Sequence, residues 1–126
     1  MYLMMKIISM NIRGVRGAHK RKYLRELIHK EQAGMVCLQE IKCKDLGSHE
    51  IFKMWGSNEI EWVVNGNVNN VEGVITMWRK SCFCLRTVFN GSNYSIIEGE
   101  WRLEEPIQTV VVNIYNTGSV LEKKAI

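Results

Sequence analysis

Two short apolar segments near the N-terminus end in polar side chains, and this arrangement restricts the fold more than any other feature. Residues 6–10 precede Asn11, and residues 35–39 precede Glu40 and Lys42. Apolar runs of this length are typical of buried strands. Each strand would therefore deliver one oxygen ligand, an amide or a carboxylate, to the mouth of a sheet. Because hard divalent cations prefer oxygen ligands, the pattern predicts a metal site there.

The segment between these strands has the spacing of a helix. Over residues 20–32, Leu24, Leu27 and Ile28 recur at helical intervals. Gly34 is the expected C-terminal cap of this helix, since glycine tolerates the left-handed backbone that often ends one. The order strand, helix, strand indicates a βαβ-like start, although the two strands need not be neighbours.

The remainder of the chain predicts one short helix followed by a series of strands. Ser48 is the expected N-cap of a helix over residues 48–55. Turns rich in Asn and Gly then separate the strand candidates and favour antiparallel pairing. Those candidates are residues 61–64, 73–78, 82–89, 94–101 and 107–115, and residues 121–126 start a further helix. The fold class is therefore α+β.

The positive charge of the chain is concentrated in its first third. The net charge is +4, but residues 1–44 carry ten Lys and Arg against three acids, and residues 45–126 carry seven against ten. No acid lies among the basic residues near the first helix, which are Arg13, Arg16, His19, Lys20, Arg21 and Lys22. Basic side chains oppose the dipole at a helix start, so helix stability does not explain them. They predict a phosphate-bearing partner such as nucleic acid.

Length and composition limit the other possibilities. The 126 residues allow one domain, and 46% hydrophobic residues with one proline indicate a globular chain. We expect no membrane span and no secretory signal, so the expected location is intracellular, nuclear or cytoplasmic. Cys37 is expected to be a small buried apolar residue. The spacing Gly14-x-x-Gly17 is too weak to predict a nucleotide cofactor.

Four motifs in order resemble a known enzyme superfamily. They occupy residues 9–14, 37–42, 73–78 and 112–115. Together they resemble the endonuclease/exonuclease/phosphatase superfamily, and within it the apurinic/apyrimidinic-type endonuclease domain of plant LINE-type (non-LTR) retrotransposons. The resemblance spans residues 1–126 but only about the first half of a typical family domain. It implies the N-terminal half of a two-sheet α/β sandwich of the DNase I type, a mixed sheet with helices on the outside.

The resemblance also implies roles for individual residues in cleaving DNA. Glu40 would bind Mg²⁺, and Asn11 would help to hold the scissile phosphate or the hydrated metal. Tyr115 falls where the family has a tyrosine that hydrogen-bonds the phosphate. Lys42 and Arg13 would add positive field. Taken singly, Asn11 also fits a turn cap, Glu40 a solvated carboxylate paired with Lys42, and Tyr115 the end of a core strand.

The sequence departs from the family pattern in ways that affect activity. Glu72-Gly73 replaces the usual Gly-Gly before the third strand, and Asn116-Thr117-Gly118 replaces a turn that contains proline. The Gly-Asp-Phe-Asn and Ser-Asp-His motifs, which supply the general base and a His–Asp pair in the family, are absent. Because such groups act as a unit, we expect an inactive or impaired fragment of a truncated domain.

Two further expectations follow. The alternative to an impaired endonuclease is a non-catalytic remnant that binds nucleic acid through the Arg13–Lys22 segment. A lone half of a sandwich would also leave an apolar sheet face uncovered, which favours self-association. The four tryptophans, Trp55, Trp62, Trp78 and Trp101, are the residues expected to be exposed by it.

Overall fold

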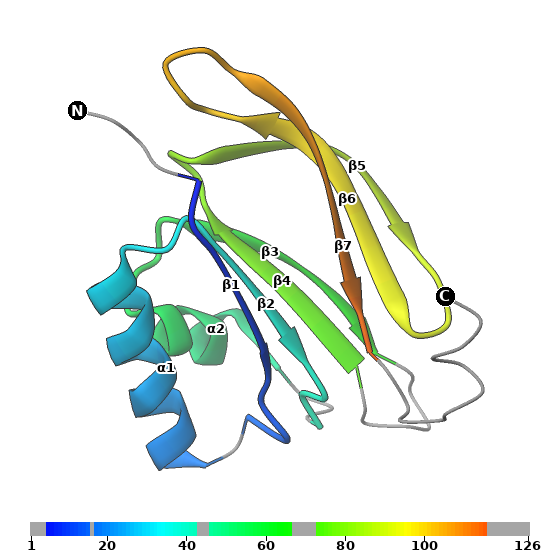
Figure 1. Ribbon diagram of the computed structural model, residues 1–126. Helices are drawn as coiled ribbons and strands as arrows, with labels where there is room; N and C mark the ends of the chain where they lie inside the picture. The colour runs from blue at the N-terminus through cyan, green and yellow to red at the C-terminus, as the bar shows by residue number, and fades with distance from the viewer. Residues whose placement is uncertain (1–4, 16, 43–45, 67–72, 116–126) are drawn as a thin grey trace.

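A computed structural model describes residues 5–15, 17–42, 46–66 and 73–115, which form three layers (Figure 1). Two helices cover one face of a four-stranded sheet, and a three-stranded sheet lies against the opposite face. This arrangement confirms the α+β prediction of a two-sheet sandwich with helices on the outside. Within the described residues, no helix is long and apolar enough to cross a membrane.

The four-stranded sheet has a mixed strand order, β1-β2-β4-β3. β1 and β2 are neighbours and run parallel, with Ile7 beside Met35 and Asn11 beside Gln39. β4 pairs antiparallel with both β2 and β3. β2 and β4 are central and buried on both faces, which explains their continuous apolar sequences. The strands are β1 (Ile7–Asn11), β2 (Met35–Gln39), β3 (Ile60–Gly66) and β4 (Gly73–Arg79).

The three-stranded sheet is antiparallel, with the order β5-β6-β7. Its strands are β5 (Phe83–Asn90), β6 (Tyr94–Trp101) and β7 (Ile107–Ile114). The register between β6 and β7 is unbroken, whereas β5 carries an irregularity between Leu85 and Thr87. In Figure 1, β1, β2 and β7 end at the same end of the molecule.

Both helices lie where the sequence predicts them, but their caps differ from the prediction. α1 (Ala18–Glu31) ends at Gln32, which has a left-handed backbone with φ of 52°. α2 (Ser48–Trp55) has Gly47 at its N-cap, with no side-chain cap. The predictions of Gly34 and Ser48 as caps are therefore wrong.

Gly34 lies where Trp101 and Cys82 leave no room for a side chain. A Cβ atom at Gly34 would lie 2.9 Å from the ring of Trp101 and 3.2 Å from Cys82 Sγ. The backbone therefore passes against an indole ring at this point, and any side chain would push the two apart.

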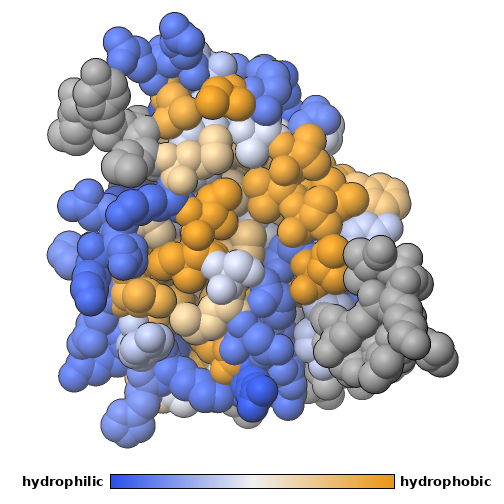
Figure 2. Space-filling model, viewed as in Figure 1, coloured by the Kyte–Doolittle hydropathy of each residue, from blue (hydrophilic) through white to orange (hydrophobic). Residues whose placement is uncertain are grey.

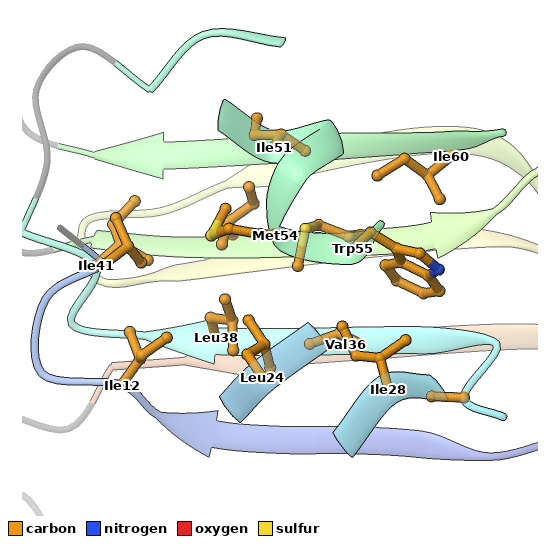
Figure 3. Packing of buried hydrophobic residues seen from close by; sticks show 14 residues of the cluster. Ile12, Leu24, Ile28, Val36, Leu38, Ile41, Ile51, Met54, Trp55 and Ile60 are labelled. Carbon is orange, nitrogen blue, oxygen red and sulfur yellow. The ribbon is translucent and has the colours of Figure 1, made fainter. Parts of the chain in front are cut away.

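Two clusters of buried side chains hold the layers together. Figure 3 shows the first, in which Leu24 and Ile28 of α1 and Met54 and Trp55 of α2 pack on the four-stranded sheet. The second cluster fills the space between the two sheets. Its members are Met35, Cys37, Trp78, Cys82, Phe83, Ile97 and Trp101. Burial raises the pKa of the Cys37 thiol to about 11, which agrees with its predicted apolar role.

The tryptophans are not the exposed residues of this fold. Trp55, Trp78 and Trp101 are at most 3% exposed, and Trp62 is partly buried against Phe52. The prediction of their exposure is wrong because the two sheets and α2 enclose them. The exposed apolar residues instead include Val110, Val112 and Ile114, which alternate along β7. An apolar band is visible on the β7 side of the molecule, whereas the α1 side is hydrophilic (Figure 2).

Candidate active site

The segments after β1 and β2 stay paired beyond the sheet, and this pairing builds the candidate site. The Ile12 amide donates to the Gln39 carbonyl at 3.0 Å, and the Gly14 amide donates to the Glu40 carbonyl at 2.7 Å. The Val15 amide continues the series to Ile41 at 3.0 Å. Ile12, Val15 and Ile41 are buried and anchor both segments in the core. Asn11 and Glu40 are therefore held next to each other at the mouth of the sheet.

The backbone at this mouth is strained. Four non-glycine residues of the described chain have positive φ, and three of them lie here: Arg13 at 50°, Glu40 at 58° and Lys42 at 46°. Side chains other than glycine rarely adopt this left-handed conformation. Such strain persists only where the surrounding structure enforces it, and it gathers at functional sites.

Glu40 has a specific set of charged and polar neighbours. Its carboxylate pairs with Lys42 Nζ at 3.0 Å, and its side chain is 15% exposed. The Lys42 hydrogen bond lowers the pKa of Glu40 and outweighs partial burial, which acts in the opposite direction. Asn11 and the charge of Arg13 lower this pKa further. The structure thus brings together four of the predicted site residues, Asn11, Arg13, Glu40 and Lys42.

The lowered pKa of Glu40 has a measurable consequence. Because the pKa in the folded state lies below the ordinary value of 4.5, the stabilisation is complete above that value and is lost as the pH falls through the folded pKa. We expect the Glu40 carboxyl carbon to titrate below pH 4.5 in an NMR experiment. Lys42→Ala should move the midpoint upward, and Lys42→Arg should largely restore it. An unchanged midpoint in Lys42→Ala would contradict this assignment.

A buried asparagine joins the candidate site to the second sheet. Asn113 of β7 is 1% exposed, and its Oδ1 accepts from Gln39 Nε2 at 2.8 Å. Its Nδ2 lies within hydrogen-bond distance of the Ile75 carbonyl at 3.0 Å, Thr76 Oγ1 at 3.1 Å and the Leu38 carbonyl at 3.4 Å. We call this group the Asn113 clasp. It fixes β7 over β2 and β4, and its partner Gln39 directly precedes Glu40.

Tyr115 lies immediately beyond β7, at the same end of the sandwich as Glu40 (Figure 1). Its amide donates to the Asn93 carbonyl at 2.8 Å, and its carbonyl accepts from Asn93 Nδ2 at 2.9 Å. These bonds fix the backbone of Tyr115 two residues after the clasp. The phosphate-binding role of Tyr115 stays a prediction.

Two basic residues of α1 hold the loop that follows β1. Lys20 Nζ donates to the Arg13 carbonyl at 2.6 Å, and Arg21 Nε donates to the Val15 carbonyl at 2.6 Å. Both cations also keep further N–H donors for other partners. Lys22 is exposed on the same helix, and Arg16 lies outside the described residues. The DNA-binding role of these residues stays a prediction.

The donor set at the mouth fits one kind of metal. No cluster of three or more His, Cys, Asp or Glu occurs in the part of the chain that the structure describes. Mg²⁺ usually keeps several waters and takes only one or two carboxylates. Asn11 Oδ1 accepts from the Arg13 amide at 3.2 Å, as a turn cap does. The single carboxylate of Glu40 beside this amide suits a hydrated ion and does not suit Zn²⁺, which needs three or four protein ligands.

Comparisons with known proteins establish the fold. No family model and no curated protein matches the sequence. Among solved structures, the AP endonuclease LMAP from Leishmania major matches with a TM-score of 0.66 and 19% identity. The Xenopus laevis APE2 catalytic domain matches with a TM-score of 0.62 and 17% identity. D. rerio TDP2 complexed with single strand DNA product matches with a TM-score of 0.62 and 13% identity.

These matches cover nearly all of the chain but only part of each solved protein. They include 96%, 94% and 95% of this chain, respectively, and 43%, 47% and 50% of the solved chains. The chain therefore spans about half the length of these proteins, or less. At such identities the likeness shows a shared fold, and it confirms the predicted sandwich of the DNase I type.

Sequence reasoning assigned no role to Asn113. One feature pointed to it, because an asparagine follows three consecutive valines in the strand Ile107–Ile114. A polar side chain on the inward face of a strand needs partners. Which strands supply them depends on how the sheets stack, which the sequence does not show.

Proposed function

We propose that this chain is part of a Mg²⁺-dependent endonuclease that hydrolyses phosphodiester bonds in DNA. One observation carries the proposal: the paired ends of β1 and β2 hold the Asn11 amide beside the Glu40 carboxylate, and Glu40 itself has a strained, left-handed backbone. Structures have such strain where a group must be held for function. The likeness to solved AP endonucleases supports the reaction class.

The residues of the site have two proposed roles, metal binding and phosphate binding. Glu40 and Asn11 would hold Mg²⁺, which supplies charge to stabilise the phosphate and the leaving oxygen when it is bound. Lys42 and Arg13, already beside Glu40, place positive charge where phosphate oxygens would lie. The Glu40 carboxylate, whose pKa lies below the ordinary value, is ionised at neutral pH and can therefore bind a cation.

DNA is the proposed substrate because of charge. The segment between Ile12 and Arg25 has no acidic residue, and Arg13, Lys20 and Lys22 are exposed along it. Contacts of this kind supply most of the sequence-independent affinity for DNA. The likeness to TDP2, solved with single strand DNA product, agrees with this choice.

We propose that the isolated chain has little or no catalytic activity. Within the described residues, Glu40 is not part of any group of three or more His, Cys, Asp or Glu side chains, and the family motifs that supply a general base are absent from the sequence. Hydrolysis needs a group to orient or deprotonate the attacking water. Its absence should remove most of the rate. The motifs further suggest an origin in a plant LINE-type retrotransposon, and the proposed location stays intracellular, nuclear or cytoplasmic.

Metal binding tests the proposal even when cleavage is weak. In a titration with Mn²⁺ as a paramagnetic probe, we expect selective broadening of the NMR signals of residues 11–14 and 40–42. Glu40→Gln should weaken Mn²⁺ binding by at least about tenfold, since the site loses its single charged ligand. Glu61→Gln, an exposed carboxylate on β3, is the matched control and should bind Mn²⁺ like the wild type.

Cleavage is tested with supercoiled plasmid under the same conditions. Any nicking should require Mg²⁺, stop with EDTA and be absent in Glu40→Gln. Detectable nicking that Glu40→Gln carries out as fast as the wild type, or no Mn²⁺ broadening around Glu40, would reject the proposed function.

A non-catalytic nucleic-acid-binding remnant is the second candidate. It is favoured by the way Lys20 and Arg21 fix the loop after β1 without using Glu40. DNA binding that is equal in Glu40→Gln and wild type, weakens steeply with salt and is independent of divalent cations would favour this alternative.

A further inference from the structure

An open pocket lies beside Asn11, between the end of β1 and the first turns of α1. Its volume is about 240 Å³, and it is lined by Met10, Asn11, Ile12, His19, Lys20 and Tyr23. This corresponds to roughly eight water molecules at ~30 Å³ each, which is space for one ring system but not for a base pair. We call it the Tyr23 pocket. It borders the proposed catalytic mouth through Asn11.

Tyr23 is an exposed aromatic residue that contributes little to the packing of the described residues. Its side chain is 60% exposed, and the neighbouring Leu24 supplies the contact of α1 with the core. Tyr23 makes no hydrogen bond or ring contact with the other described residues. Its spacing from His19 and Lys20, four and three residues, places all three on one side of the helix. One side of the ring is therefore available to a ligand.

The pocket combines apolar and cationic surfaces. Met10 and Ile12 form an apolar wall, and Lys20 stands at the rim with donors left after its bond to Arg13. Scattered exposed aromatic residues are ordinary on protein surfaces. An aromatic ring beside apolar side chains and a lysine is instead the combination that holds single-stranded nucleic acid, with bases stacked on rings and phosphates on cations.

We propose that the Tyr23 pocket binds one unpaired nucleobase of the DNA strand, next to the phosphate held at Asn11 and Glu40. This inference rests on the proposed function, because it places the base relative to the scissile phosphate. A base inside a duplex cannot enter the pocket, since it is stacked and paired. The pocket therefore makes the chain prefer single-stranded or locally unpaired DNA.

Binding measured without metal tests the pocket separately from catalysis. We expect a fluorescein-labelled oligothymidine, in low salt with EDTA, to show an anisotropy increase with the wild-type chain. Tyr23→Ala should weaken this binding by about tenfold, while Tyr23→Phe keeps the ring and the affinity. Binding to a duplex of the same length should be equal in all three chains.

Phe89→Ala is the matched control. Phe89 is also an aromatic residue with 60% exposure, but it lies on β5 in the other sheet. Its loss should leave oligothymidine binding unchanged. Thermal unfolding followed by circular dichroism should show that Tyr23→Ala folds like the wild type.

The outcomes separate the pocket from the proposed enzyme. Equal weakening of single-strand and duplex binding in Tyr23→Ala, an equal loss in Phe89→Ala, or no binding of oligothymidine by the wild type would overturn the pocket. Tyr23-dependent binding without Mn²⁺ at Glu40 would uphold the pocket and reject the catalytic role. Mn²⁺ binding at Glu40 without any effect of Tyr23→Ala on oligothymidine binding would overturn the pocket and leave the catalytic role standing.

Discussion

Replacing Trp101 with alanine is expected to lower the free energy of unfolding by about 4 kcal/mol. Trp101 is fully buried between the sheets, packs against Phe83 at 6.1 Å between ring centroids and closely contacts Gly34. Its Nε1 has no hydrogen-bond partner among the described residues, so truncation removes packing alone. Equilibrium unfolding in urea measures the loss as a lower midpoint with little change in slope.

Phe89→Ala serves as the control for Trp101→Ala. Its ring is exposed and stacks only on Tyr94, with centroids 6.1 Å apart. The expected loss is below about 1 kcal/mol. A loss in Trp101→Ala no larger than that in Phe89→Ala would mean that the two sheets are not packed as described.

Replacing Asn113 with alanine is expected to cost about 3 kcal/mol. The change deprives Gln39, Thr76 and two buried carbonyl groups of a partner, and each unsatisfied buried group costs about 1–3 kcal/mol in isolation. Local rearrangement and water reduce the sum. The loss should appear in urea unfolding and as a lower melting temperature.

Two variants distinguish the effect of breaking the Asn113 clasp from the effect of losing any asparagine. Asn93→Ala removes one side-chain bond, to the Tyr115 carbonyl, and should cost about 1 kcal/mol. Asn113→Asp keeps the shape but turns a carboxylate toward the Ile75 and Leu38 carbonyl oxygens, so it should be no more stable than Asn113→Ala at neutral pH. A stable Asn113→Asp variant would reject the described bonds.

The sequence was sufficient to predict the elements and their class because their apolar patterns are local. Among the described residues, the predicted helices and strands lie within a few residues of the observed ones, and the mouth formed by β1 and β2 follows from where two apolar runs end. The helix predicted over residues 121–126 lies outside the described residues. The neighbouring positions of β1 and β2 were left open, because strand order depends on how β4 enters the sheet between β2 and β3.

Three features were outside the reach of local patterns. The apolar pattern predicts exposed tryptophans, whereas stacking of the sheets encloses Trp78 and Trp101. The position of Gly34 predicts a helix cap, whereas the absence of a side chain makes room for the ring of Trp101, 67 positions later in the chain. The left-handed backbone of Glu40 arises from pairing with the loop after β1 and has no signature in its own sequence.

Through the Asn113 clasp, cation binding at the candidate site depends on whether the second sheet has docked. Gln39 bonds to Asn113 of the distant strand β7, and the very next residue is the proposed metal ligand. A cation that binds only the arrangement with the clasp closed stabilises that arrangement, and closure in turn raises the affinity for the cation. Docking of the second sheet and occupancy of the site are then a single linked equilibrium. A chain whose second sheet has not docked would therefore lose affinity for the cation as well as stability.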